Sequence, residues 1–346
     1  MKKFARRLLL LSLFLVYSPL TVVQASENES APNGFSVTPL SIETGEPQSS
    51  YYDLTVVPNE EKKIKLKLFN SSAKDIEVKV EVNNGITNNN GITSYLKEKK
   101  RDSSLKVGLT DFTKVENEKI KVPKQGYAEA VLHLTIPDKA FEGEILGGVR
   151  FTSNDVKNDD SSKETAVTNN MAYTVGILLR EDAKKFSPEI KLNEIKIEQR
   201  NSRNYISSNL QNAAPTLVKE LEVKAEVTNK GEKEVLYTAS NSDMRMAPNS
   251  NFFYGISLQN QPFKAGNYTM KITGTADGEA FSFEKDFKID KEEAKKLNES
   301  AVFVTDKPQD NTWLYVALGG VVVLLLLTGG YIVYIKKNGG KAVDED

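Results

Sequence analysis

The 346-residue chain contains no cysteine and a single histidine, His133. Without cysteine there is no disulfide, no thiolate nucleophile and no cysteine metal ligand, so each domain must be stabilised by its hydrophobic core. One histidine leaves at most one candidate for a Ser-His-Asp triad or a histidine-based zinc site. His133 lies on the polar side of an alternating strand, and no nucleophile, base or metal ligand lies near it in sequence. We therefore predict a non-enzymatic protein without metal or other cofactor.

The chain also lacks an excess of positive charge, because its 46 Lys and Arg are balanced by 47 Asp and Glu. A nucleic-acid partner is therefore not expected. The glycine pairs do not have the spacing of a phosphate-binding loop, which argues against a nucleotide. Residues 97–101 form one local basic segment. This segment is either a solvated loop or a contact for anionic cell-wall polymers.

Two apolar segments predict where the protein works. Residues 1–25 combine four early Lys and Arg, an apolar run and a small-residue cleavage site at Ala25, which is the pattern of a secretory signal peptide. Residues 313–335 carry no charge, and a helix of that length reaches about 34 Å, enough to cross a bilayer core of about 30 Å. Lys336 and Lys337 mark residues 336–346 as a cytoplasmic tail. We predict a single-pass protein of the cell membrane whose N-terminal part is extracellular, at the cell wall.

The extracellular part shows the period-2 alternation of β-strands almost throughout. Apolar residues alternate with charged ones in residues 64–68, 76–82 and 221–227, and turn residues lie between such runs. This pattern predicts an all-β fold of two tandem Ig-like β-sandwich domains plus the C-terminal transmembrane helix. We place the first domain at residues 35–152 and the second at residues 165–290. Polar linkers at 26–34 and 153–164 and a partly helical stalk at 291–312 separate the parts.

Aromatic pairs and one glycine pair are the candidate ligand-binding residues. Adjacent strand residues point to opposite faces, so one member of Tyr51-Tyr52 and one of Phe253-Tyr254 should be exposed. An exposed aromatic ring offers a flat apolar face to a sugar or a protein. Gly147 and Gly148 lie inside a strand-like run, where glycine marks either a β-bulge or a close approach of a ligand to the backbone.

Several motifs occur in a fixed order along the chain. The more specific are Phe141-Glu142-Gly143-Glu144-Ile145-Leu146-Gly147-Gly148 and Ala247-Pro248-Asn249-Ser250. The others are residues 35–39, 51–54, 172–177, 209–212 and 265–269. In this order the motifs resemble the WxL-interacting proteins of Gram-positive bacteria. The resemblance covers nearly the whole chain, including the order of signal peptide, two β domains, membrane helix and short tail.

The resemblance implies a first domain that binds peptidoglycan and a second that binds a host ligand. It also implies a WxL-domain surface protein as partner, and a host extracellular protein as a further one. We therefore predict a membrane-anchored binding protein that holds the wall with one domain and a surface protein with the other. One alternative is an extracellular assembly chaperone that adds a strand to a secreted client. Another is a wall hydrolase using two of the many carboxylates.

Overall fold

A computed structural model describes residues 34–48, 51–98, 100–153 and 171–301, and near the C-terminus residues 319–320, 324 and 326–334. The predicted signal peptide, the tail at 336–346, most of both linkers and residues 302–312 of the stalk lie outside the described residues. Residues 313–318, 321–323, 325 and 335 of the predicted transmembrane segment also lie outside them. Within the part of the chain that is described, no helix is both long and apolar enough to cross a membrane.

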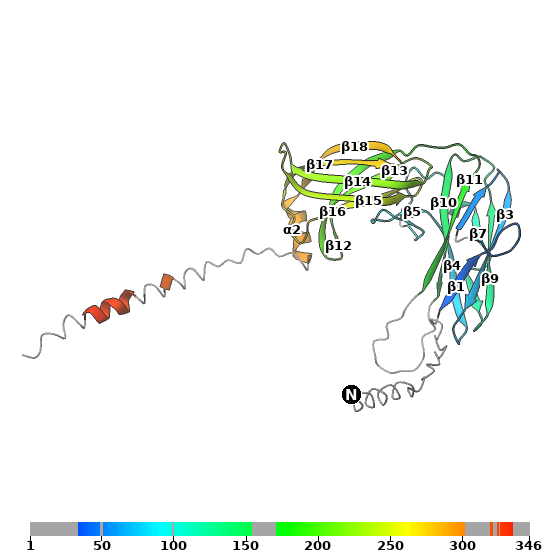
Figure 1. Cartoon of the computed structure of the whole chain (residues 1–346), viewed down its shortest axis with the longest axis horizontal. Helices are drawn as coiled ribbons and strands as arrows, with labels where there is room; N and C mark the ends of the chain where they lie inside the picture. Colours follow the sequence, from blue (N-terminus) through cyan, green and yellow to red (C-terminus); the bar gives the residue numbers. More distant parts are fainter. Residues whose placement is uncertain are drawn as a thin grey trace, which may run out of the picture. The chain divides into compact units, whose positions relative to one another are not determined.

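The chain divides into two compact units, and the first is a two-layer β-sandwich (Figure 1). One layer has the strand order β1-β3-β9-β7 and the other β2-β11-β10-β4-β8. The strands of the first layer are β1 (Phe35–Pro39), β3 (Glu61–Asn70), β9 (Tyr127–Thr135) and β7 (Thr113–Val115). Those of the second are β2 (Tyr51–Thr55), β11 (Ala172–Arg180), β10 (Glu144–Ser153), β4 (Ile76–Asn84) and β8 (Lys119–Val122).

Alternation in the sequence builds the core between these layers, as predicted. Ile64, Leu66 and Leu68 of β3 are each 0% exposed, while the lysines between them lie towards solvent. β4 contributes Val78 and Val80 in the same way. Burial of this apolar surface, at about 25 cal/mol per Å², holds the two layers together without any disulfide.

The strand β11 lies in the first unit, which differs from the expected boundary at residue 165. β11 pairs antiparallel with β10 from Glu144↔Arg180 to Thr152↔Ala172, and parallel with β2. Val175, Ile177 and Leu179 of β11 are buried in the first core. The apolar face of β11 packs into the core of the first unit. Its backbone hydrogen bonds are made with β10 on one side and β2 on the other. The first unit therefore extends to Lys185.

The second unit is another pair of packed sheets (Figure 1). Its sheets have the orders β12-β13-β16 and β15-β14-β17-β18. It also takes in the short segments Thr87–Ser94 and Asp102–Ser104. The strands are β12 (Ile190–Arg200), β13 (Arg203–Asn212), β16 (Ser250–Ser257), β15 (Val235–Met246), β14 (Val218–Asn229), β17 (Gly266–Ala276) and β18 (Glu279–Ile289); the remaining short elements of the chain are β5 (Ile86–Thr87), β6 (Thr93–Ser94) and η1 (Leu109–Asp111).

The turn between β17 and β18 is the tight hairpin that Asp277-Gly278 predicts. Ala276 pairs with Glu279, so the loop has two residues, and both have positive φ (49° and 86°). Two consecutive positive φ values are the signature of a type I′ turn.

The helix α2 (Lys291–Ser300) forms where the stalk is predicted to be helical, and it packs on the second unit (Figure 1). Ala294 is 4% exposed and belongs to the core of this unit. The Asn298 side chain accepts a hydrogen bond from the Phe263 N–H at 2.9 Å and donates one to the Phe263 carbonyl at 3.0 Å. These contacts make α2 part of the second unit and not a separate spacer.

Candidate functional site

Four residues form one row across the outer face of the five-stranded sheet of the first unit. Tyr51 pairs with Gly176, Gly176 with Gly148, and Gly148 with Asn83, so the row crosses β2, β11, β10 and β4. Tyr51 is 51% exposed, whereas its neighbour Tyr52 is 1% exposed on the core side. The structure therefore brings two of the sequence-predicted residues, Tyr51 and Gly148, onto one surface.

The side chain of Tyr95 lies over the two glycines of this row, Gly148 and Gly176. A Cβ added at Gly148 would lie 2.8 Å from Tyr95 Cδ1, and one added at Gly176 would lie 2.8 Å from the Tyr95 hydroxyl. Asn83 Nδ2 donates to the Tyr95 carbonyl at 3.0 Å and holds this segment in place. Burial raises the pKa of the Tyr95 hydroxyl above its usual value of 10.0. The side chains of Tyr51 and Tyr95 thus lie next to the backbone of Gly148 and Gly176.

No β-bulge occurs at Gly147-Gly148, so that interpretation of the glycine pair is wrong. The register of β10 runs without a shift from Glu144 to Thr152 against β11 and from Gly147 to Ser153 against β4. The glycines are instead required by packing. A Cβ at Gly147 would lie 2.4 Å from Leu109 Cδ2, on the core face, just as Tyr95 occupies the space over Gly148. The close approach to the backbone is made by side chains of the same chain; a ligand contact at either glycine stays a prediction.

Tyr52 fixes the first unit from inside. Its hydroxyl lies 2.9 Å from the Leu40 carbonyl and 2.8 Å from the Lys65 carbonyl, and it accepts from the Leu40 N–H at 3.0 Å. Burial, only partly offset by the Leu40 hydrogen bond, raises the pKa of Tyr52 to about 12. A hydroxyl used in this way is not available to a ligand.

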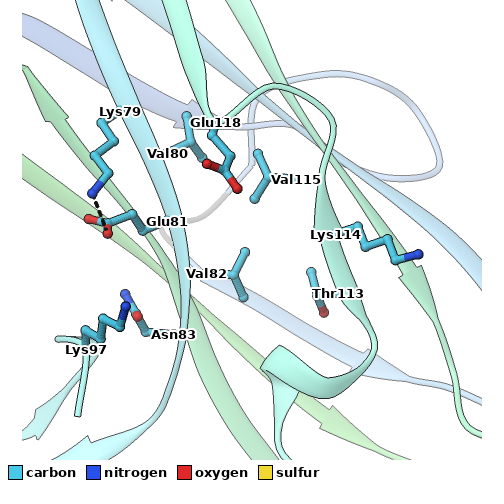
Figure 2. A pocket seen from close by; sticks show the side chains of 10 residues that line it. All are labelled: Lys79, Val80, Glu81, Val82, Asn83, Lys97, Thr113, Lys114, Val115 and Glu118. Atoms are coloured by element: carbon cyan, nitrogen blue, oxygen red, sulfur yellow. Dashed lines mark hydrogen bonds and ion pairs between the residues drawn. The ribbon is translucent and has the colours of Figure 1, made fainter. Parts of the chain in front are cut away.

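A groove of about 590 Å³ continues from the row along β4 (Figure 2). Figure 2 shows Lys97 beside Asn83 on one side of β4, and Val80, Val82 and Val115 between β4 and β7 on the other. Lys79 and Glu81 form an ion pair at 2.7 Å on the outer face. The full lining is Lys79, Val80, Glu81, Val82, Asn83, Lys97, Thr113, Lys114, Val115 and Glu118.

The first unit therefore carries a candidate binding surface made of the aromatic row and this groove. The sequence predicted Tyr51 and Gly148 but missed Tyr95 and two of the groove lysines, Lys79 and Lys114. A glycine pair inside a strand does signal that a large side chain packs on it, but the sequence does not say which. Lys97 belongs to the basic segment 97–101 that the sequence indicates. Arg101 of the same segment forms an ion pair with Asp111, with 2.5 Å between Arg101 Nη2 and Asp111 Oδ1.

In the second unit, Phe253 and Tyr254 of β16 point to opposite faces, as predicted. Tyr254 is 3% exposed, and its hydroxyl lies 2.8 Å from Asn241 Oδ1 and 3.1 Å from the Val223 carbonyl. Burial raises the pKa of Tyr254 to about 12. Phe253 lies on the opposite face, where the Lys196 ammonium sits 3.6 Å from its ring centroid. This is the geometry of a cation–π contact.

A charged cluster surrounds Phe253 on the three-stranded sheet. Arg200 donates to the Phe253 carbonyl at 2.7 Å and to Ser207 Oγ at 3.0 Å. Glu198 accepts from Arg200 Nε at 2.8 Å and pairs with Lys196 at 2.9 Å. Burial acts to raise the pKa of Glu198, but these donors outweigh it and the pKa is lowered. The face is thus a pre-arranged polar surface that carries the Phe253 ring and the Tyr205 ring, whose centroid lies 5.1 Å from Arg200 Cζ.

The described residues contain no cluster of three or more His, Cys, Asp or Glu side chains able to hold a metal ion. His133 is on the solvent side of β9, and its Nε2 lies 3.0 Å from Glu116 Oε2.

The contact between Tyr95 and Gly176 gives a testable prediction. Gly176→Ala is expected to lower the free energy of unfolding by about 1–2 kcal/mol, because the new methyl group overlaps the Tyr95 hydroxyl. Adding Tyr95→Phe removes the overlapping oxygen, since the next ring atom is 3.3 Å away. Urea denaturation of the wild type, both single variants and the double variant checks this. Additive losses in the double variant would contradict the packing role of the glycine.

The comparisons with known proteins agree with the division into two binding modules. Residues 35–153 match the family model "WxL Interacting Protein, peptidoglycan binding domain" and residues 162–299 match "WxL Interacting Protein, host binding domain". Both families are binding domains. No curated protein matches the chain.

The solved structures that are similar to the chain at low identity include chaperones. Three of these are the E. coli chaperone DraB (12% identity, 74% of this chain and 98% of that chain, TM-score 0.30), the class 5 fimbriae chaperone CfaA (16%, 73% and 99%, 0.29) and the YadV chaperone (9%, 74% and 99%, 0.29).

The two family models together account for most of the chain, in the order that the sequence motifs indicate. The chain therefore belongs to the WxL-interacting protein family, with a peptidoglycan-binding domain followed by a host-binding domain.

Proposed function

We propose that this protein is a membrane-anchored, non-catalytic connector at the cell surface. Its first unit attaches to peptidoglycan, and its second binds a WxL-type surface protein or a host ligand. Residues 313–335 anchor it to the membrane as a single helix, with the Ig-like sandwiches outside. Two linked sites of modest affinity gain from high effective concentration, so the pair holds more firmly than either site alone.

The exposed Tyr51 next to the Tyr95 ring is the observation that carries the proposal for the first unit. The rings of Tyr51 and Tyr95, each with a polar hydroxyl at its edge, suit a sugar with its apolar faces and hydroxyl rims. The groove beside it adds ammonium and carboxylate groups for the charged parts of the same polymer.

For the second unit, the face around Phe253 suits a protein partner. Tyrosine and arginine are enriched in interface hot spots, and here Arg200 lies over the Tyr205 ring beside Phe253. The Glu198–Arg200–Ser207 contacts hold these side chains in place before binding, which reduces the entropy lost on association.

The test is co-sedimentation of purified residues 26–312 with insoluble peptidoglycan. Tyr51→Ala is expected to weaken binding about tenfold, the usual cost of removing an aromatic contact. Tyr127→Ala is the matched control, because Tyr127 is 57% exposed on the other sheet of the same unit. Loss of binding in the Tyr127 variant alone would move the site to the four-stranded sheet. No co-sedimentation of the wild type would refute the wall-binding role.

A separate measurement addresses the chaperone alternative. If the protein is a connector, removing it from cells leaves the surface partner synthesised but released from the wall. If it is a chaperone, the partner disappears altogether because its folding fails.

A further inference from the structure

The strand β4 has an open edge beyond the point where β8 ends. β8 pairs with β4 only from Ile76 to Lys79, and the Val80 N–H then donates to the Glu118 carbonyl at 2.8 Å. β10 continues along the other side as far as Asn84. In an antiparallel strand alternate residues direct their backbone groups to alternate sides, so Val82 directs its N–H and C=O to the same side as Val80. Among the described residues, none hydrogen-bonds to these two groups of Val82.

The second wall of this opening is β7, an edge strand of the other sheet, which pairs with β9 alone. Val80, Val82 and Val115 form an apolar floor between the two strands (Figure 2). Thr113 on β7 also lines the groove, and its Oγ1 is buried without a hydrogen-bond partner in the described part of the chain. A buried hydroxyl without a partner is unfavourable for the free energy of folding, so this oxygen lowers the stability of the free protein.

The charges around the groove indicate the ligand's sign. Three ammonium groups line it, those of Lys79, Lys97 and Lys114, against the two carboxylates of Glu81 and Glu118. Glu81 is already paired with Lys79. The surplus favours a ligand that carries a carboxylate.

We propose that this groove binds an extended peptide with small apolar side chains and at least one carboxylate, added as a short strand along Val82. The peptide stem of peptidoglycan has this chemistry, with alanine residues and free carboxyl groups. The inference rests on the proposed wall-binding function. It specifies that this groove binds the peptide part of peptidoglycan and not the glycan. Backbone pairing provides affinity, the shallow valine floor selects small side chains, and the lysines engage the carboxylates.

The test uses the full chain in detergent and a fluorescently labelled stem pentapeptide, L-Ala-γ-D-Glu-L-Lys-D-Ala-D-Ala. Binding is measured by anisotropy and by amide hydrogen exchange. We expect the peptide to slow exchange at Val82, and Lys97→Glu to weaken binding at least fivefold. Lys63→Glu makes the same charge change on an exposed position of β3 and is expected to leave binding unchanged.

A second variant separates binding from folding. Thr113→Val removes the unpartnered hydroxyl while keeping the shape of the side chain. We expect it to raise the melting temperature of the free protein and to leave the affinity for the peptide unchanged, because Thr113 Oγ1 is not exposed to the groove. A loss of affinity in Lys97→Glu but not in Thr113→Val would separate a contact with the peptide from a change in stability.

Two outcomes would overturn the inference. One is a stem peptide that neither binds nor protects Val82, while the protein still co-sediments with intact peptidoglycan. The other is equal protection of Val82 by peptide-free glycan chains. Failure of the proposed function is distinguishable, because it appears as loss of co-sedimentation with intact peptidoglycan.

Discussion

Tyr52→Ala is expected to lower the free energy of unfolding of the first unit by about 3–5 kcal/mol, the usual range for truncating a fully buried aromatic residue. Tyr52 is 1% exposed, and its hydroxyl joins Leu40 to the Lys65 carbonyl of β3. Truncation removes the ring from the core and removes the hydroxyl that bridges these backbone groups, although the Leu40 N–H still donates to the Lys65 carbonyl at 3.1 Å. Urea denaturation of residues 26–312, followed by circular dichroism, measures the loss.

Two variants at the same pair of positions serve as controls. Tyr52→Phe keeps the ring and removes only the hydroxyl, so we expect a loss of about 1–3 kcal/mol. Tyr51→Ala should change the free energy of unfolding by less than about 0.5 kcal/mol, because this ring is on the surface. The prediction is wrong if truncating the two neighbouring tyrosines destabilises the protein equally, because the assignment of one to the core and one to the surface depends on that difference.

The same two residues show how far the sequence predicts the site. Period-2 alternation requires that Tyr51 and Tyr52 point to opposite faces. It cannot identify the exposed member, because the alternating pattern of β2 is too short to define its apolar side. Phe253 and Tyr254 pose the same problem in a longer strand. In both pairs the buried side chain is the second member, Tyr52 or Tyr254. The hydroxyl of each has two hydrogen-bonding partners inside the protein.

Strand positions are predictable where charged and apolar residues alternate strictly. Leu221, Val223 and Val227 of β14 are at most 1% exposed, as their alternation predicts. The assignment of β11 to a unit was not accessible in the same way. The polar linker suggests a boundary before β11, yet its hydrogen bonds go back to β2 and β10. Pairing between distant strands is a tertiary property, and only their registers reveal it.

The groove and the aromatic row depend on such distant pairing even more strongly. Tyr51, Gly148 and Asn83 are far apart in sequence and form one row only because three strand registers agree. Tyr95 then lies over that row from a segment without regular secondary structure. No local pattern marks these partners, whereas the glycine pair itself was visible as an anomaly in a strand.

Alkaline pH is expected to destabilise both units through their buried tyrosines. The pKa values of Tyr52 and Tyr254 are raised from 10.0 to about 12 in the folded protein. Between these values the unfolded chain binds fewer protons than the folded one, so the free energy of unfolding falls as pH rises. The stability is complete below about pH 10 and is lost as pH passes through the folded pKa. A difference of about two pKa units corresponds to about 3 kcal/mol for each tyrosine.

Comparing the wild type with Tyr52→Phe and Tyr254→Phe isolates these contributions from the lysines that titrate in the same range. Each variant should be less stable than the wild type at neutral pH, where its hydrogen bonds are missing. Each should also lose less stability between pH 10 and pH 12, because no hydroxyl remains to ionise. The tyrosinate absorbance should show the corresponding late proton loss, with the wild type retaining protonated tyrosine above pH 11. If the free energy of unfolding of the wild type and of the variants depends on pH in the same way, the two hydroxyls are not protected by burial. In that case the assignment of Tyr52 and Tyr254 to the core is wrong, and so is the division of each aromatic pair into one core and one surface residue.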